Sequence, residues 1–348
     1  MAEVIRALLD SEDPSVRYRA LVEVCGLAAD SALARQTQAA IPASTRVKRL
    51  LGFRNEEGRI AGNVYAKYTG AHWRLADLAD MRYPAGDGVL EPIRDQVCEA
   101  WLSPQHVQER IIEREAPRYK SQPGVAVIEG RARRCASQEG NALYAIMALG
   151  LADARADQLA ANLIRWQWPD GGWNCDRKTT ASTSSFHESL LPMRGLAWHA
   201  KVTDSTASMQ AVERCAEFFL SRRLFKRKRD GSIIRDSFLK LRYPHYWHYD
   251  ILNALKVMVE AGYINDPRCA DALDLLETKQ LPNGGWRAEG KHYKAMDEPH
   301  HGGSVVEWGI VSRRKEMNLF VTLEALEVLK AAGRLPMTQA ELLTLGEA

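Results

Sequence analysis

Side chains that could carry out acid–base chemistry stand at the starts of strongly apolar segments of this chain. Asp250 lies in the run HYWHYD, among aromatic residues and close to His248. A carboxyl group buried among such rings would have a raised pKa and could act as a general acid, and an adjacent histidine could orient it. We therefore predict catalytic roles for Asp250 and His248, with Glu139 and Glu188 as the next candidates.

The same segment starts carry aromatic and polar side chains that could line a binding site. Ring faces stabilise positive charge, so an apolar chamber rich in aromatic residues suits a substrate that forms a carbocation. The predicted substrate-binding residues at these starts are Tyr68, His72, Trp73, Tyr243, Trp247, Arg313 and Asn318. The alternative is that such first-turn residues only cap their helices and face solvent.

Helices are the elements that must position these side chains. Sustained alternation with a period of two, which is typical of strands, is almost absent. One helix type is apolar on nearly every side, as in HYDILNALKVMVEAG from His248, and must be covered all round. The other type has one apolar stripe, as in the segment from Thr206, where Val212, Cys215 and Phe219 share a face. The chain is therefore predicted to be all-α.

The two helix types alternate along the chain, at spacings regular enough for a repeat. Apolar helices are predicted to begin near Pro14, His72, Gly140, His187, His248 and Asn318. Fully buried helices that alternate with one-sided ones imply two concentric layers, and six of each would close into an (α/α)6 toroid around a cavity. Residues 1–348 would then form one domain, with a HEAT-like opening helix pair in 1–30. The alternative is an open HEAT-type solenoid.

Composition and charge limit the class of partner. Of the 348 residues, 46% are hydrophobic, and the net charge is only +3, so nucleic acid is not an expected partner. No stretch approaches the roughly 18 uninterrupted apolar residues of a transmembrane helix. The N-terminus lacks the pattern of a signal peptide, and the six cysteines are scattered among apolar positions. These features predict a cytoplasmic protein with reduced thiols.

Two similar motifs stand out in the sequence. QWPDGGWNCD follows Trp166 and QLPNGGWRAEG follows Lys279, and each separates an amphipathic helix from an apolar one. The Asp/Asn-Gly-Gly turn would end the first helix with residues that accept positive φ. The chain thereby resembles the α/α-toroid superfamily of squalene-type terpenoid cyclases and protein prenyltransferase β subunits, in which this QW motif is structural.

The resemblance implies an enzyme that acts on an isoprenoid or similar apolar substrate in a central cavity. The implied reaction is acid-initiated or carbocation cyclisation or isomerisation. The DxDD motif that supplies the acid in squalene–hopene-type cyclases is absent from this sequence. A partner subunit, which prenyltransferase β subunits need, and a homo-oligomer both stay open. No nucleotide-cofactor motif occurs.

Similarity to the prenyltransferases implies a different use of the second motif. In that family, basic residues, an Asp and a zinc-binding Cys follow a Gly-Gly-aromatic turn. Lys291, Lys294 and Asp297 match this spacing, and the two lysines join the predicted substrate-binding set. Pro299 stands where the family has its zinc cysteine. That ligand is therefore lost.

A zinc site would need a replacement for this ligand. The family's zinc histidine opens an inner helix, and His187 stands at the matching place. With Cys175 and His248 it would form a Cys/His/His site with an open position, the form of a catalytic zinc centre. Its chemistry would be prenyl transfer or thiol addition, as in prenyltransferases and lanthionine cyclases. A third alternative is a non-catalytic toroid that binds an apolar ligand.

Overall fold

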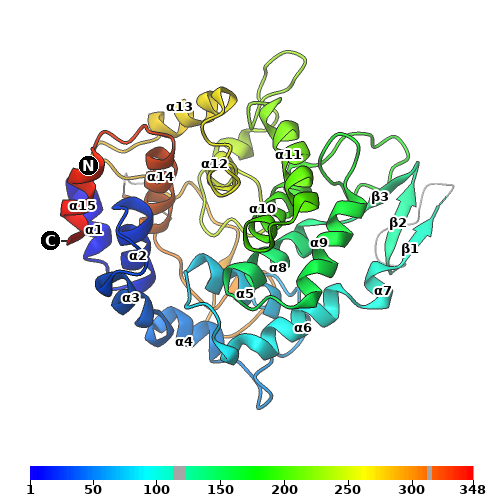
Figure 1. Ribbon diagram of the computed structural model, residues 1–348, viewed down its shortest axis with the longest axis horizontal. Coiled ribbons are helices and arrows are strands. Elements are labelled where there is room, and N and C mark those ends of the chain that lie inside the picture. The colour runs from blue at the N-terminus through cyan, green and yellow to red at the C-terminus, as the bar shows by residue number, and fades with distance from the viewer. Residues whose placement is uncertain (113–122, 312–315, 348) are drawn as a thin grey trace.

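The computed structural model describes residues 1–112, 123–311 and 316–347. Most of the regular structure is helical, as the spacing of apolar residues predicted, and the strands are short (Figure 1). None of the helices in the described ranges combines the length and the hydropathy that a membrane crossing requires. The predicted site residue Arg313 lies outside the described residues.

Helices that are buried on most sides surround the centre of the molecule (Figure 1). They are α2 (Pro14–Arg19), α5 (Ala71–Asp80), α8 (Ser137–Ala148), α10 (Phe186–Thr203), α12 (Ile251–Glu260) and α14 (Leu319–Ala331). A π-helix, η1 (Ala20–Val24), continues α2. Because α14 contacts both α2 and η1, the last buried helix meets the first, and in Figure 1 the buried helices are arranged as a ring around the centre.

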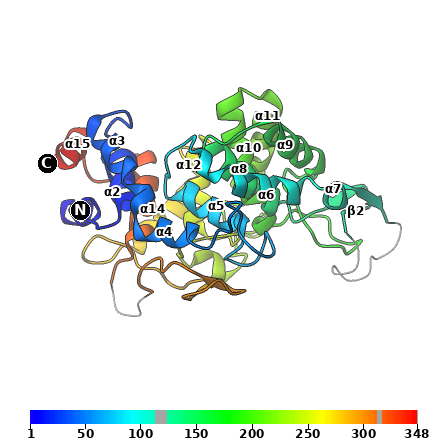
Figure 2. The same ribbon diagram turned by 90° about the horizontal axis from the view of Figure 1, so that it is seen from below.

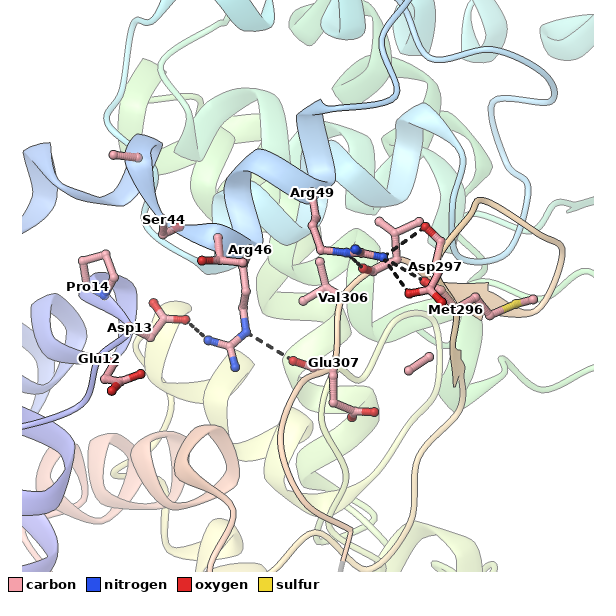
Figure 3. A pocket seen from close by; sticks show the side chains of 14 residues that line it. Glu12, Asp13, Pro14, Ser44, Arg46, Arg49, Met296, Asp297, Val306 and Glu307 are labelled. Carbon is pink, nitrogen blue, oxygen red and sulfur yellow. Dashed lines mark hydrogen bonds and ion pairs between the residues drawn. The ribbon is translucent and has the colours of Figure 1, made fainter.

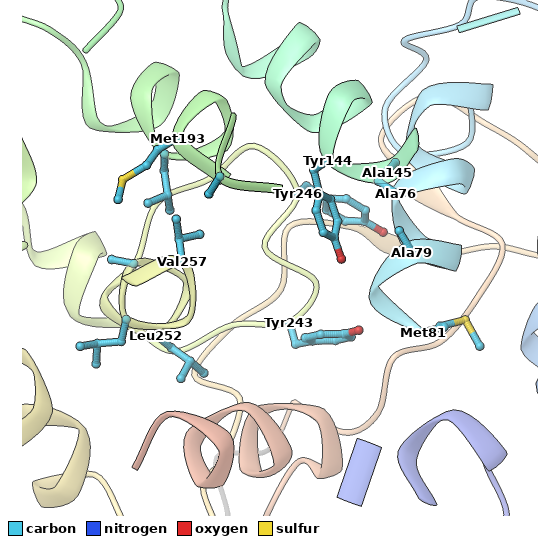
Figure 4. Close-up of a cluster of buried hydrophobic side chains, with 14 of the residues drawn as sticks. Ala76, Ala79, Met81, Tyr144, Ala145, Met193, Tyr243, Tyr246, Leu252 and Val257 are labelled. Carbon is cyan, nitrogen blue, oxygen red and sulfur yellow. The ribbon is translucent and has the colours of Figure 1, made fainter. Parts of the chain in front are cut away.

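Helices with a single buried stripe lie outside this ring. They are α1 (Ala2–Leu9), α3 (Ala32–Ala39), α4 (Thr45–Leu51), α6 (Glu91–Trp101), α9 (Ala154–Trp166), α11 (Thr206–Leu220), α13 (Ala270–Thr278) and α15 (Gln339–Glu347). The short helix α7 (Pro104–Val107) has no buried residue. In α9 the buried residues Leu159, Leu163 and Trp166 recur at helical spacing. The buried apolar side chains form one continuous cluster, part of which Figure 4 shows around Tyr144, Tyr243 and Tyr246.

Two small sheets are the main departure from the all-helical prediction. β2 (Val125–Ile128) pairs in parallel with β1 (Glu109–Ile111) and antiparallel with β3 (Arg131–Arg133). This sheet lies at the opposite end of the molecule from the two chain termini (Figures 1 and 2). A second pair joins β4 (Lys294–Ala295) to β5 (Gly303–Ser304). Strands of two to four residues are too short to leave a period-two pattern in the sequence.

The two Gly-Gly-Trp turns have the same local contacts. In each, the Gln amide donates to the carbonyl of the first glycine, and the Trp indole donates to a carbonyl of the preceding outer helix. The pairs are Gln167–Gly171 (2.7 Å), Gln280–Gly284 (3.0 Å), Trp173–Leu163 (2.9 Å) and Trp286–Leu276 (2.8 Å). The first glycine of each turn has positive φ, which explains its identity. Each turn is therefore fixed to the outer helix that it follows.

Candidate functional site

The predicted central chamber is filled by side chains. The hollow at the centre has a volume of about 20 Å³ and is lined by residues of α5, α8, α10, α12 and the loop before α12. A cavity of roughly 10–15 Å³ holds one water molecule, so this hollow does not hold a polyene. The expectation of an open apolar cavity is therefore corrected by the structure. The physical reason is a network of buried charges.

This charged network joins the inner helices across the centre. The Arg194 guanidinium contacts Asp80 (2.8 Å) and Glu260 (2.6 Å), and the Lys256 ammonium contacts Glu324 (2.5 Å) and Asp80 (3.4 Å). Burial would raise the pKa of Asp80, but the charges of Arg194 and Lys256 hold it well below its usual range. Asp80 is thus an ionised, paired carboxylate.

Asp250, the predicted acid, belongs to the edge of this network. Its Oδ1 accepts the backbone N–H groups of Leu252 and Asn253, both at 3.0 Å, and so caps α12. Its Oδ2 lies 3.2 Å from Nδ1 of His245. Both oxygens of Asp250 therefore have hydrogen-bond partners. The histidine that Asp250 contacts is His245, in place of the predicted His248.

His245 is the positive partner of two carboxylates. Its Nε2 lies 2.7 Å from Glu324, opposite the contact with Asp250. Burial lowers the pKa of His245, but Asp250 and Glu324 outweigh burial and raise it to about 9. His245 is therefore protonated at neutral pH.

Asp77 has the environment that was expected of Asp250. It lies in α5, is 5% exposed, and lines the central hollow together with Trp73 and Tyr246. Its buried Oδ2 has no hydrogen-bond partner among the described residues. Burial, followed by the charge of Asp80, raises the pKa of Asp77 well above its usual value, against the opposing effect of Arg74. Asp77 is a buried carboxyl group that favours its protonated form.

Aromatic rings cover the Asp77 side of the hollow. Tyr68 stacks on Tyr246 with ring centroids 3.7 Å apart, and Trp73 presents its edge to both rings at 5.1 and 5.3 Å. His72 packs against the Trp73 ring with centroids 4.6 Å apart, and its Nδ1 accepts the indole N–H of Trp101 at 3.2 Å. Burial lowers the pKa of His72 to about 3, so it is neutral. The structure thus brings together the predicted residues Tyr68, His72 and Trp73.

A second aromatic group surrounds His248. Its ring stacks between His292 (3.4 Å) and Trp247 (4.0 Å), and its Nε2 hydrogen-bonds the Tyr68 hydroxyl at 3.0 Å. Burial, and then the charge of His292, lowers the pKa of His248 to about 2. Lys67 lies 4.5 Å above the Trp247 ring. His248 is therefore a neutral ring within this aromatic group.

The three predicted zinc ligands do not converge. Among the described residues, the ligand atoms of Cys175 group with those of Cys135 and Glu188, all within 4.8 Å of one another. His187 instead accepts the backbone N–H of Tyr249 at its Nδ1 (3.0 Å). Glu188 accepts the Ser137 hydroxyl at 2.8 Å and the Cys175 thiol at 3.5 Å. The thiol of Cys175 therefore has different neighbours from those expected.

The remaining predicted residues lie outside the central hollow. Asn318 caps α14 by accepting the N–H groups of its first turn, while its amide donates to two loop carbonyls. Tyr243 stacks on Phe320 at 4.6 Å. Lys291 pairs with Glu307 at 3.2 Å, and Lys294 is exposed on β4. Of these residues, Asn318 follows the alternative that first-turn residues are caps.

Glu139 occupies a buried ion pair beside a larger pocket. It contacts Arg134 (2.6 Å) and His106 (3.0 Å). Burial raises the pKa of Glu139, although Arg134 opposes the rise. The adjacent pocket has a volume of about 500 Å³ and is lined by Tyr65, Lys67, Arg134 and His106, among others. It lies at the starts of α5 and α8, and its rim is aromatic and basic.

Another hollow lies between α2, α4 and the segment from 295 to 307 (Figure 3). It measures about 630 Å³. Its arginines are already engaged: Arg46 pairs with Asp13, and Arg49 donates to the carbonyl of Val305 at 2.6 Å and of Asp297 at 3.0 Å. These side chains hold the loop against the helices, so we do not assign a site there.

Comparison with known proteins gives only distant similarity. No protein-family model matches this chain, and no curated protein matches it. Two solved structures are variants of the type II terpene cyclase MstE from Scytonema in complex with geranylgeranyl dihydroxybenzoate, and each is 15% identical to this chain with a TM-score of 0.30. The first match covers 88% of this chain and 100% of the MstE chain, and the second covers 86% and 98%. A third, an apo variant, is 16% identical, covers 88% of this chain and all of its own, and has a TM-score of 0.28. The function must therefore be derived from this chain's own residues.

Proposed function

We propose that this protein is a terpene-cyclase-like enzyme that protonates an apolar, alkene-bearing substrate of the isoprenoid class, with Asp77 as the acid. The ring of helices is, in this proposal, an α/α toroid of the terpenoid-cyclase type. The observation that carries the proposal is the Asp77 carboxyl group, which is buried against aromatic rings with one oxygen unpaired. A carboxylic acid kept neutral in such surroundings can donate its proton near neutral pH.

The reaction that these groups support begins with proton transfer. The O–H bond of Asp77 breaks, a C–H bond forms at the alkene, and the substrate becomes a carbocation beside the Asp77 carboxylate. The faces of Tyr68, Trp73 and Tyr246 stabilise the positive charge during cyclisation or isomerisation. The substrate cation then loses a proton to water while the Asp77 carboxylate takes one up from solvent, so the acid is restored and no further reagent is consumed. Asp80 stays ionised throughout because Arg194 and Lys256 pair with it.

Substrate entry requires the central hollow to enlarge. Tyr246 lines the hollow, Tyr68 stacks on the Tyr246 ring, and both residues belong to segments outside regular helices. Tyr68 follows Tyr65 and Lys67, which line the pocket of about 500 Å³ at the starts of α5 and α8. We assign this pocket to the polar head of the substrate, so that the apolar tail displaces Tyr68 on its way to Asp77.

The test is turnover of linear polyprenes, with free, epoxidised and diphosphorylated ends, by the purified full chain and by Asp77→Asn. The wild type should convert one class of these substrates, and Asp77→Asn should lose at least about 100-fold in kcat. The variant should stay folded and lose no stability at neutral pH, because a carboxyl group with a raised folded-state pKa destabilises the fold once the pH exceeds its unfolded value.

Asp157→Asn is the matched control, since Asp157 lies on the outer helix α9 with its carboxylate largely exposed. It should keep wild-type turnover. Absence of conversion by the wild type with every polyprene would remove the proposed activity. Full activity in Asp77→Asn would show that another group is the acid.

A further inference from the structure

We propose that Cys135, Cys175 and Glu188 form a binding site for a Zn²⁺ ion. Their ligand atoms all lie within 4.8 Å of one another, and they are the one group of three His, Cys, Asp or Glu side chains in the described ranges that meets this spacing. Thiolate and carboxylate are both ordinary zinc ligands. The site goes beyond the proposed acid chemistry, because it shares no residue with the Asp77 hollow.

The spacing of the ligand atoms suits tetrahedral coordination. Zinc–sulfur bonds of about 2.3 Å and zinc–oxygen bonds of about 2.1 Å place neighbouring ligand atoms about 3.6 Å apart. The Sγ of Cys175 lies 3.5 Å from Oε1 of Glu188. Small side-chain rotations would bring the Cys135 sulfur to the same separation. The site therefore needs no backbone rearrangement.

The three ligands come from segments that the fold fixes to one another. Cys135 lies between β3 and α8, Cys175 follows the first Gly-Gly-Trp turn, and Glu188 is in the first turn of α10. The backbone N–H of Arg134 donates to the carbonyl of Asn174 at 3.1 Å, which joins the two cysteine segments. The N–H of Trp173 donates to the Ser189 hydroxyl at 2.9 Å, which joins the turn to α10. Such preorganisation lowers the entropic cost of binding an ion.

Zinc binding would change the protonation and the net charge of the three ligand groups. The thiol of Cys175 donates to Oε1 of Glu188 at 3.5 Å, so a proton now lies between two of the ligands. Zinc binding would form two S–Zn bonds and one O–Zn bond and release to solvent the protons of both thiols and any proton on the Glu188 carboxyl group. The remaining net charge of −1, from three anionic ligands and one Zn²⁺, would be balanced by Arg134, whose charge already acts on Glu188.

Three protein ligands leave the fourth zinc position open. The pocket of about 500 Å³ borders the cluster, because Arg134, the residue before Cys135, lines it. Tyr65 also lines the pocket of about 500 Å³. A water molecule or a substrate atom could therefore take the fourth position from that pocket, as in catalytic zinc sites. The two cysteines are half-buried, in agreement with access from one side.

The test is metal analysis of the untagged full chain, purified after growth with added zinc. We expect about one zinc ion per chain and, after exchange for Co²⁺, a thiolate-to-cobalt charge-transfer absorption. Cys135→Ser and Cys175→Ser should each lower the zinc affinity at least about 100-fold, more than the loss of an outer-shell partner would. Cys98→Ser is the control, because Cys98 is a buried thiol on α6. It should bind zinc like the wild type.

Two results would overturn the proposal. One is wild-type protein without bound zinc and without a cobalt–thiolate absorption. The other is a disulfide between Cys135 and Cys175 in protein purified without reductant, which would make the thiols a redox pair. The cobalt measurement on the wild type stands even if a serine variant does not fold. None of these readouts needs a substrate. The zinc site can therefore be absent while the proposed Asp77 activity is present, and the activity can be absent while zinc is bound.

Discussion

At the scale of single residues, two aspartates one helical turn apart on α5 differ in protonation because their neighbours differ. Asp80 contacts Arg194 and Lys256, and these charges keep it ionised. Asp77 has no such contact, and the negative charge of Asp80 adds to the effect of burial. Pairs of titratable groups whose pKa values are driven apart commonly divide acid and base roles. This contrast supports Asp77 as the proton donor.

His245 allows a test of the charged network by pH. Its replacement in His245→Gln leaves Asp250 and Glu324 without their shared positive partner, and removing one member of a buried ion pair costs about 3–5 kcal/mol of the free energy of unfolding. The pKa of His245 is raised to about 9, so its stabilisation is complete below the unfolded value of about 6.5 and is lost as the pH rises through 9.

The measurement is urea denaturation of the wild type and of His245→Gln at pH 6 and at pH 9.5. The difference in free energy of unfolding should be smaller at the higher pH. His300→Gln, an exposed histidine, should differ little from the wild type at either pH. A difference that does not change with pH would contradict a charged His245.

At the scale of elements, α8 and α10 approach each other closely at two glycines. A Cβ atom at Gly140 would lie within 3.0 Å of backbone atoms of Leu191 and Pro192, and one at Gly195 would meet the Gly140 carbonyl oxygen. Backbone atoms cannot move aside as flexible side chains can. This close approach places the starts of α8 and α10, and with them Glu188 and the Cys135 segment, next to each other.

We expect Gly140→Ala to push these two helices apart. The added methyl group should lower the free energy of unfolding by about 1–3 kcal/mol, the usual cost of overpacking a core. Gly88→Ala serves as the control because a Cβ there meets no atom within 4 Å. Thermal unfolding followed by circular dichroism gives the comparison. Equal stability of the two variants would mean that the helices can separate without cost.

At the scale of the whole molecule, Arg19 joins the first inner helix to the last. Its buried guanidinium contacts Glu23 at 2.7 Å and Glu327 of α14 at 3.1 Å. Burial and the charge of Glu23 raise the pKa of Glu327 to about 7, against the effect of Arg19. The contact between α14 and the α2–η1 segment is therefore partly electrostatic, and it closes the ring of buried helices.

Arg19→Met should destabilise the protein by about 3–5 kcal/mol, because Glu327 would stay buried without its partner, whereas Glu23 keeps its ion pair with Arg82. Adding Glu327→Gln should recover part of this loss, since it removes the unpaired carboxylate. Denaturant midpoints of the single and double variants, with the exposed Arg35→Met as reference, measure both effects. A loss no larger than that of Arg35→Met would mean that apolar packing alone closes the ring.

The helical elements and their layering could be predicted from the amino-acid sequence alone. The spacing of apolar residues determines whether a helix is buried on all sides or along one stripe. The apolar runs from His72, His187 and His248 accordingly correspond to α5, α10 and α12. The caps Asp13 and Asn318 are local features, and the Gly-Gly-Trp turns need positive φ. The extent of the single domain over 1–348 and the oligomeric state stay predictions.

Which side chains meet at the centre was decided only by the tertiary structure. The sequence does show that Asp77 is a carboxyl group inside an apolar helix. Its pKa, however, depends on burial and on the nearby charges of Asp80 and Arg74. Cys135 lies beside Cys175 because a backbone hydrogen bond from Arg134 to Asn174 joins segments that are 40 positions apart in the sequence. Sequence spacing fixes which face of a helix is buried, whereas pKa values and ligand sets depend on contacts between distant segments. The filled centre follows from those same contacts.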